Sequence, residues 1–382
     1  MKILQSCGSR SWGGLEMQAL MTSVELRKRG HDVSLLCLPR TTLLREAYSA
    51  GVPAVSLLGE DRNAFATIKD LSRLFRSYNY DVVHTHLSHD LWWIVPALKL
   101  ASSDAKLFLT KHMASGVKKT DPLHKFLYGR LQGTFAISNY IKGSVMNTCP
   151  VSASDVHVVP PGISLEVFDP ALYNKSEIRR QLGIPGNVVL VGMIGRMTPG
   201  KGHEEFLKAA AMLSETSDVR FQFIVAGTAS EGEEAYGLKV RQLASDLGVG
   251  NVVQFTGFVK DVPRLLAALD ILAFPSHEES FGLGLTEAMA MELPVVGSGN
   301  AGVLDIVVEG ETGFLVPPTD FMALAATISD LARHPELRLR FGKAGRERVE
   351  RFFGIKSIVD RLESHYSKEP IKHRELNGQS HS

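Results

Sequence analysis

The side chains best suited to chemistry gather between residues 275 and 290. Glu279 and Glu287 stand eight residues apart, and Gly282 and Gly284 lie between them. These glycines can open a helix and present backbone amides to a phosphate. A carboxylate one turn inside the helix, Glu287, can accept two hydrogen bonds from a ribose diol, and Glu279 in the preceding loop can reach sugar hydroxyls. The alternatives are that Glu279 only complements the helix N-terminus and that Glu287 is a surface charge.

A second candidate site is the loop of residues 192–202, which is rich in glycine and contains one proline. It carries two cations, Arg196 and Lys201, ahead of a helix expected to begin near His203. Both side chains could bind one pyrophosphate through charge-assisted hydrogen bonds. The Walker pattern is not matched, because no Gly-Lys-Ser/Thr is present. A solvated basic loop is the alternative, but a lysine flanked by two glycines has little packing purpose.

A third candidate is the turn of residues 8–16, where the first expected strand passes into a helix. Gly13 and Gly14 would let backbone amides approach a phosphate at the helix N-terminus. A tight turn without a ligand is the alternative. The turn lacks the three spaced glycines of the dinucleotide fingerprint, which argues against an NAD-dependent enzyme.

Composition argues against metal, disulfide and membrane-spanning classes. Enzymes that hold a diphosphate through a metal commonly use an Asp-x-Asp motif. No Asp-x-Asp occurs in the chain, so we expect a metal-independent reaction with no cofactor. Cys7, Cys37 and Cys149 are too far apart for a zinc motif and suit a reducing cytoplasm. No apolar run reaches the roughly 18 residues of a spanning helix, and the N-terminus reads directly into a strand, so secretion is not expected.

These candidate sites need a scaffold of alternating strands and helices. A chain of 382 residues suggests two domains. Short continuous apolar runs indicate strands buried on both faces of a parallel sheet. The alternation with helices predicts two doubly wound α/β units. The expected strands are residues 3–7, 33–38, 54–58, 81–86, 106–111, 133–137 and 156–159 in the first half, and 188–194, 221–226, 252–255, 271–274, 294–296 and 313–316 in the second.

We place the first domain at residues 1–165 and the second at 183–352. A C-terminal helix at about 353–368 is expected to pack back on the first domain. Residues 369–382 are polar and are expected to form a disordered tail.

The first half of the chain is basic. Residues 1–165 hold 19 Lys+Arg and 12 Asp+Glu, a net charge of +7, which leaves −6 for the rest. The stretch 118–130 concentrates the cations around Phe126 and Leu127. It could rest on an anionic membrane surface with these apolar residues dipping in. The alternatives are that the charge is scatter between domains and that Phe126 and Leu127 pack in the core.

In this order, the Gly13-Gly14-Leu15-Glu16 turn, the Gly195-Arg196…Lys201-Gly202 loop and the Glu279-x7-Glu287 pair resemble the retaining glycosyltransferases of family 4. The resemblance covers residues 1–365. It implies the GT-B fold, in which two Rossmann-like doubly wound domains face each other across a cleft. The second domain would bind a nucleotide sugar, and the first would take the acceptor.

The resemblance also assigns roles to individual residues. Arg196 and Lys201 would bind the donor diphosphate, Glu279 the sugar and Glu287 the ribose. The implied donor-binding set is Gly13, Gly14, Gly195, Arg196, Lys201, Glu279, Ser280, Phe281, Gly282, Leu283 and Glu287.

His112 resembles the family histidine beside the transferred sugar, and with Glu279, Arg196 and Lys201 it completes the expected catalytic set. For His112 the alternative is a polar residue at a strand end. The implied acceptor-side residues are Glu16, His84 and His86, and for the two histidines a structural role stays equally open.

Two departures from the family pattern stand near the donor site. Ser280 occupies a position where glycine is usual, and Ala301-Gly302-Val303-Leu304-Asp305 replaces the usual Gly-Gly-x-Pro-Glu. The contacts of this second loop, and the role of Asp305, are left open.

The expected function is retaining transfer of a hexose-type sugar from a nucleotide diphosphate sugar, with UDP as the family's commonest carrier. The acceptor would be a saccharide or lipid-linked saccharide in cell-envelope polysaccharide or lipopolysaccharide synthesis. We expect a cytoplasmic protein, peripheral at the inner membrane face, with no nucleic acid partner. The alternatives are a UDP-sugar epimerase of the same fold and a non-catalytic nucleotide-sugar-binding protein.

Overall fold

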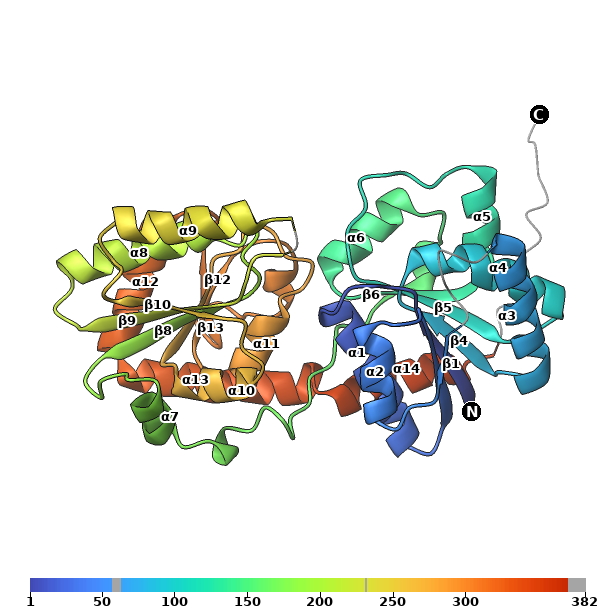
Figure 1. Cartoon of the computed structure of the whole chain (residues 1–382), viewed down its shortest axis with the longest axis horizontal. Coiled ribbons are helices and arrows are strands. Elements are labelled where there is room, and N and C mark those ends of the chain that lie inside the picture. The colour runs from blue at the N-terminus through green and yellow to red at the C-terminus, as the bar shows by residue number, and fades with distance from the viewer. Residues whose placement is uncertain (57–62, 231, 370–382) are drawn as a thin grey trace. The chain divides into compact units, whose positions relative to one another are not determined.

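The computed structural model describes residues 1–56, 63–230 and 232–369. The expected tail lies outside these residues apart from Glu369, as does the end of the expected strand 54–58. Contacts divide the chain into two units (Figure 1). The first comprises Met1–Ala136, Lys142–Val159 and the chain from Val359 onward; the second comprises Ile137–Ile141 and Pro160–Ile358. The stretch 166–182, which the sequence left between the two domains, belongs to the second unit, and so do residues 160–165, which were expected in the first domain.

The first unit is built on a parallel sheet whose described strands run in the order β3-β2-β1-β4-β5-β6-β7. The order reverses direction between β1 and β4, so the loops that follow these two strands diverge at a topological switch point, where such sheets bind ligands. β1 is buried from its second residue onward, which is typical of a strand covered on both faces, and its buried residues include the polar Gln5 and Ser6. The strands are β1 Lys2–Cys7, β2 Asp32–Cys37, β3 Ala54–Val55, β4 Val82–Thr85, β5 Lys106–Lys111, β6 Leu131–Ala136 and β7 Val156–Val158.

The helices of the first unit begin at residues with recognisable start signals. α3 begins after Asn63, whose side chain accepts from the Phe65 amide, and α5 begins at Pro122 after the Asp121 cap. α3 packs on α4, and α4 packs on α5 (Figure 1). The helices are α1 Gly14–Lys28, α2 Thr42–Ser49, α3 Ala64–Tyr78, α4 Leu91–Ala101, α5 Pro122–Tyr128 and α6 Asn139–Thr148, with short turns η1 Ser88–Asp90 and η2 Ala153–Asp155.

The second unit repeats the plan with described strands in the order β10-β9-β8-β11-β12-β13, all parallel. Its switch point lies between β8 and β11. Helices α8 and α12 pack together over a core that includes Phe206, Phe223 and Phe341. The strands are β8 Val189–Ile194, β9 Phe221–Ala226, β10 Val253–Gly257, β11 Ile271–Phe274, β12 Val295–Ser298 and β13 Gly313–Val316.

Between β8 and β12 the strands of the second unit alternate with helices, and the last described helix returns to the first unit. Val359, Leu362 and Tyr366 on this helix, α14, are all buried. The helices are α7 Lys175–Gln181, α8 His203–Thr216, α9 Glu234–Asp246, α10 Val262–Ala268, α11 Leu283–Ala290, α12 Phe321–Arg333, α13 Pro335–Phe352 and α14 Ile355–Ser367, with short turns η3 Pro170–Leu172 and η4 Ala301–Asp305.

Two parallel Rossmann-like sheets confirm the predicted fold class. The strands expected at 106–111, 221–226, 271–274 and 313–316 have the observed bounds, and most others differ by one or two residues. The strand expected to end at His86 ends at Thr85, because the chain turns there into η1. In the described residues, no helix combines the length and apolarity that crossing a bilayer requires.

Candidate functional site

The candidate residues of the second unit lie on the loops that follow β8 and β11, the two strands at its switch point. The first loop runs from the end of β8 at Ile194 to α8, and the second runs from the end of β11 at Phe274 to α11. Because the strands are adjacent and parallel, both loops leave the same edge of the sheet. The sheet therefore brings together two segments that lie far apart in the sequence.

The two loops are fixed to each other by backbone contacts. The His277 amide donates to the carbonyl oxygen of Gly200 at 2.8 Å. Gly202 has φ +83°, and a β-carbon there would lie 2.1 Å from the carbonyl oxygen of Pro275. Only glycine fits this position, because any side chain would push the loops apart.

Lys201 and Glu279, the predicted diphosphate and sugar ligands, form an ion pair across the two loops. Ser276 Oγ donates to Glu279 Oε1 at 3.0 Å, so the carboxylate has two partners. Glu279 is well shielded, with a side-chain exposure of 13%, whereas Lys201 is 27% exposed. A partly shielded cation next to a carboxylate acceptor can bind an anionic group and a neighbouring hydroxyl.

Gly282, Leu283 and Glu287 lie at the start of α11. Gly282 is the N-cap with φ +116°, and the helix begins at Leu283. Free amides and the helix dipole at this end favour an anion. Glu287 is half-buried one turn further on, and burial raises the pKa of its carboxyl to about 7. Phe281 is buried against Phe353 at a ring-centroid distance of 5.7 Å, so it anchors the loop.

The two positions that depart from the family pattern have structural contacts. The Ser280 carbonyl oxygen accepts from Ser138 Oγ at 2.6 Å. A β-carbon on Gly302 would lie 2.4 Å from the same oxygen, so the η4 turn packs tightly against this loop. The Asp305 carboxylate accepts from the backbone amide of Asn139 at 2.6 Å and from its side-chain amide at 2.9 Å. Asp305 therefore holds Asn139, which belongs to the second unit with it.

The contacts of Gly195 and Arg196 differ from those of the Lys201–Glu279 pair. Gly195 continues the strand ladder, since its amide donates to the Ala226 carbonyl at 3.0 Å. The Arg196 side chain is exposed, and its Nη1 lies 3.4 Å from Ser230 Oγ. Although Arg196 lies on the same loop as Lys201, its guanidinium therefore contacts the loop after β9.

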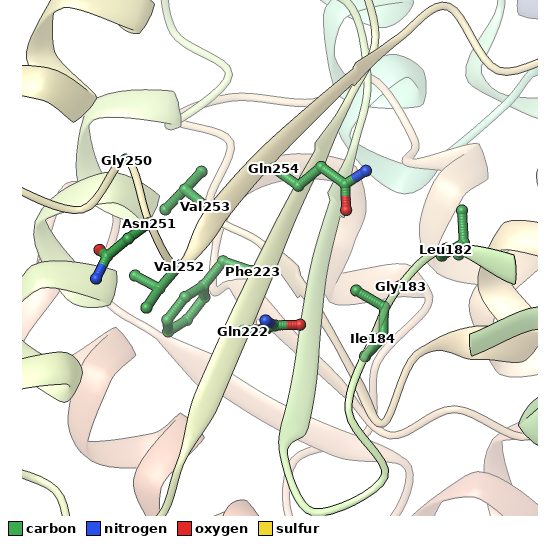
Figure 2. A pocket seen from close by; sticks show the side chains of 10 residues that line it. All are labelled: Leu182, Gly183, Ile184, Gln222, Phe223, Gly250, Asn251, Val252, Val253 and Gln254. Carbon is green, nitrogen blue, oxygen red and sulfur yellow. The ribbon is translucent and has the colours of Figure 1, made fainter. Parts of the chain in front are cut away.

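A hollow of about 230 Å³ lies at the opposite edge of the same sheet (Figure 2). It is bordered by Gln222 near the start of β9, by Val253 at the start of β10, and by Gly183 after α7. Since ligand sites of doubly wound sheets lie where strands end, this hollow is separate from the candidate site.

In the first unit, the Gly13-Gly14 turn opens α1 after β1. Glu16 Oε2 accepts from the Gly13 amide at 2.9 Å, which forms a capping box. Glu16 is 4% exposed, so this predicted acceptor-side carboxylate caps its own helix in the structure. Asp90 braces the start of the loop by accepting from Ser6 Oγ at 2.7 Å and from the Gly8 amide at 3.1 Å.

His86 and His112 meet at the ends of the adjacent strands β4 and β5. His86 Nδ1 lies 3.1 Å from His112 Nε2, and His86 Nε2 lies 2.9 Å from Gln5 Oε1. Because a carbonyl oxygen only accepts, His86 donates from Nε2 and accepts at Nδ1. His112 then donates from Nε2, which leaves its Nδ1 as an acceptor.

His84 lies deeper, on the inner end of the same hydrogen-bonded chain. Its Nδ1 lies 2.6 Å from the Tyr366 hydroxyl, and its Nε2 lies 2.7 Å from Thr110 Oγ1. Gln5 Nε2 reaches the same Tyr366 hydroxyl at 3.5 Å. Both ring nitrogens of His84 are thus occupied by protein groups, which favours a structural role for this residue.

Burial keeps these histidines neutral. It lowers the pKa of His86 to about 4 and holds the pKa values of His84 and His112 well below their ordinary range. Neutral rings can donate and accept hydrogen bonds but do not attract an anion. Sequence reasoning missed Gln5, Tyr366 and Asp90, since only the folded chain brings residues 5, 86 and 366 together.

The basic stretch 118–130 is split between core and surface. Leu127 is 3% exposed, so the prediction that it dips into a membrane is wrong, because it packs inward from α5. Phe126 and Leu123 on the same helix are exposed. Lys99 Nζ lies 5.2 Å from the Phe126 ring centroid, which mixes cationic and apolar groups on this surface.

Comparisons with known proteins show the family to which the chain belongs. The family models "Glycosyltransferase Family 4" and "Glycosyl transferases group 1" match residues 12–167 and 174–348. The D-inositol 3-phosphate glycosyltransferase of Corynebacterium efficiens is 33% identical over 96% of this chain and 92% of its own length. That of Corynebacterium glutamicum is 28% identical over 99% and 97%.

Solved structures give the same picture. A glycosyltransferase from Rickettsia africae has a TM-score of 0.86 and 25% identity over 96% of this chain and 97% of its own. Anabaena HepE in complex with UDP and glucose has a TM-score of 0.82 and 22% identity over 97% and 100%. Both align along nearly the whole chain, so the likeness extends to both units.

Proposed function

Since this chain belongs to the group 1 glycosyl transferases, family 4, of the GT-B fold, we propose that it moves a hexose-type sugar from UDP to a saccharide or lipid-linked acceptor with retention at the anomeric carbon. UDP as carrier is supported by the Anabaena complexes with UDP and with UDP-glucose. An acceptor of the cell envelope, at the cytoplasmic face of the membrane, completes the proposal.

The observation that carries the proposal is the Lys201–Glu279 pair beside the start of α11. A nucleotide sugar presents a diphosphate next to sugar hydroxyls. Lys201 can exchange its carboxylate partner for the diphosphate, and Glu279 can then accept from the sugar hydroxyls. The Gly282–Leu283 amides add positive potential, and Glu287 one turn on is placed to accept from the ribose.

The transfer breaks the bond between the anomeric carbon and the diphosphate oxygen and forms one to an acceptor oxygen. The acceptor hydroxyl proton ends on the released diphosphate. Negative charge grows on that diphosphate as its bond breaks, and fixed cationic and amide donors stabilise it. Lys201, Arg196 and the amides at Gly282 are the donors we assign, with His112 as a neutral hydrogen-bonding group for the sugar.

Gly13 and Gly14 are assigned to the diphosphate and Glu16, His84 and His86 to the acceptor side only on the basis of the resemblance. His86 is the best supported of the three acceptor-side residues, because it contacts His112 directly. No cluster of metal-binding side chains occurs among the described residues. Whether the transfer reaction needs a metal ion is tested separately, by chelation.

A thermal-shift screen of nucleotide sugars tests the donor half of the proposal. A ligand present at about 100 times its Kd stabilises the fold by about 2.7 kcal/mol. We expect UDP and one UDP-sugar to raise Tm in the wild type and much less in Lys201→Ala. A larger shift with NAD than with any nucleotide sugar would contradict the proposal.

Product analysis separates the proposal from its alternatives. The sugar should appear on an added acceptor, and proton NMR of the product should show the donor's anomeric configuration. Conversion of free UDP-sugar to its epimer would instead identify an epimerase. Tight donor binding with no turnover on any acceptor would favour a non-catalytic binding protein.

A further inference from the structure

A second polar cluster lies at the end of β5, one residue before His112. Lys111 is the last residue of the strand, and its Nζ donates to Ser88 Oγ at 2.9 Å. Thr110 contacts His84, on the side of the histidine chain. Because successive strand residues point to opposite faces, Lys111 points away from that chain. The cluster therefore lies on the other face of the strand from the histidines, although, after burial and His86, the Lys111 charge also lowers the pKa of His112.

A second cation joins the cluster from the following loop. The Lys119 ammonium lies 5.9 Å from the Tyr128 ring centroid. Burial, followed by the nearby charge of Lys119, lowers the pKa of Lys111 to about 8. The Tyr128 hydroxyl, which accepts from the Cys149 thiol at 3.6 Å, is the remaining polar group of the cluster.

Carboxylates near this cluster are committed elsewhere. Asp121, the acidic residue of the loop, lies 2.5 Å from His124 Nδ1 and caps α5. Asp90 accepts from Ser6 and Gly8. Within residues 1–56, 63–230 and 232–369, neither Lys111 nor Lys119 forms an ion pair with a carboxylate.

Two like charges held together without a counter-ion destabilise the fold unless an anion binds between them. We propose that Lys111 and Lys119 bind a phosphate group carried by the acceptor. Ser88 accepts from Lys111, and its hydroxyl also interacts with that of Tyr128, so Ser88 orients the Lys111 ammonium. This inference rests on the proposed function, and it specifies the acceptor class as a phosphorylated saccharide or lipid.

The position suits an acceptor. A phosphate bound at Lys111 would anchor the acceptor at the end of β5, where His112 is the next residue. Exposed Leu123 and Phe126 lie on the neighbouring α5, so the phosphate could come from a lipid headgroup or from a soluble molecule. The chemistry at the lysines is the same for both sources.

The first experiment measures binding of inorganic phosphate to the full chain by isothermal titration calorimetry at low salt. Lys111→Met and Lys119→Met nearly keep the side-chain length and remove the charge. We expect each to weaken binding about tenfold, because a charge-assisted contact is lost. Lys118→Met, from the exposed lysine next door, has the same net charge and should bind like the wild type.

Two controls keep folding and the donor site apart from this result. The Tm of Lys111→Met and Lys119→Met should equal or exceed that of the wild type in the absence of phosphate, since a repulsion is removed. UDP binding should be unchanged in both. Failure of the wild type to bind any nucleotide sugar would reject the proposed function but leave the phosphate result interpretable.

Binding of glycerol 3-phosphate and binding of vesicles that contain phosphatidic acid distinguish the two sources of the phosphate. Vesicle binding that falls in Phe126→Ser, with glycerol 3-phosphate binding unchanged, would indicate a lipid headgroup. Binding of glycerol 3-phosphate without vesicle binding would indicate a soluble acceptor. Unchanged phosphate affinity in both Lys111→Met and Lys119→Met, or a loss found only in Lys201→Ala, would overturn the inference.

Discussion

The two units place their candidate residues at equivalent points of their sheets, but the side chains there are charged in one unit and neutral in the other. In the second unit the loops after β8 and β11 carry an ion pair, Lys201 with Glu279. In the first unit the ends of β4 and β5 carry neutral histidines. The parallel sheet fixes where a site can form, and the side chains after each strand decide what it can bind.

The difference follows from the state of the groups before a ligand arrives. A lysine–carboxylate pair is polarised and can exchange one partner for a diphosphate. A buried chain of hydrogen-bonded histidines gains no charge near neutral pH. It can therefore orient a ligand through hydrogen bonds, but it does not attract an anion. The lysines near Ser88 supply the charge that the histidines of the first unit lack.

The largest effect should come from removing the Lys201 ammonium, the cation of the ion pair in the second unit. Lys201→Ala should lower kcat by about 10²–10³-fold, because a donor to the leaving diphosphate is lost. Steady-state kinetics with the donor identified by the screen measures the loss. Lys208→Ala, at an exposed lysine on α8, is the matched control and should leave kcat within about twofold, since surface substitutions away from a site change free energies by about 0.5 kcal/mol or less. Near-normal turnover in Lys201→Ala would reject the assignment.

The next effect should come from Glu287. Replacement by glutamine keeps the shape but loses a charged acceptor, so UDP affinity should fall about tenfold or more. Hydrogen bonds from a ribose favour the ionised carboxylate, whose pKa is raised to about 7. UDP binding at about pH 6.5 should therefore release protons. Calorimetry in buffers of different ionisation enthalpy measures that release, and an equal release from Glu287→Gln would contradict this assignment.

The neutral histidines of the first unit should affect how the unfolding free energy depends on pH. The pKa of His86 is lowered from 6.5 to about 4, so between these two values the unfolded chain binds the extra proton. Stability from this group is present above pH 6.5 and is lost as pH falls. Against His86→Gln, the wild type should lose about 2 kcal/mol of unfolding free energy between about pH 7 and pH 5. Urea-unfolding curves that shift equally in both proteins between the two pH values would show that His86 is not buried as a neutral ring.

The smallest effect concerns metal. If protein cations stabilise the diphosphate without help, EDTA should change the rate by less than about twofold, well below the loss expected when a protein donor is removed. The control is the same assay with added Mg²⁺ or Mn²⁺ after chelation. A requirement for either ion would show that Lys201 and the α11 amides are insufficient, and it would reduce the contrast between the two sites.

The sequence could predict the parts of the site that follow strands directly. Lys201, Glu279 and Glu287 each follow a strand whose apolar run is unmistakable, and their loops meet because β8 and β11 are neighbours. The same reasoning places His86 and His112 at the ends of β4 and β5. Local pattern and parallel topology together are enough for these residues.

Other parts depend on contacts that no local pattern reveals. Tyr366 reaches His84 from 282 residues away, and Asp305 reaches Asn139 from 166 residues away. Leu127 and Phe126 are consecutive, yet one is buried and the other exposed because α5 turns only one face inward. Such outcomes are set by packing rather than by residue type.

The return of α14 to the first unit has a consequence for synthesis on the ribosome. Residues 1–136 contain six of the seven described strands of the first sheet, yet Tyr366, which completes its buried polar chain, is translated only after the whole second sheet. Until then the Gln5 and His84 side chains lack their contact with Tyr366, although His86 and Thr110 are already available to them. The second unit can close its own core while it emerges, so the part of the protein made first is the part finished last.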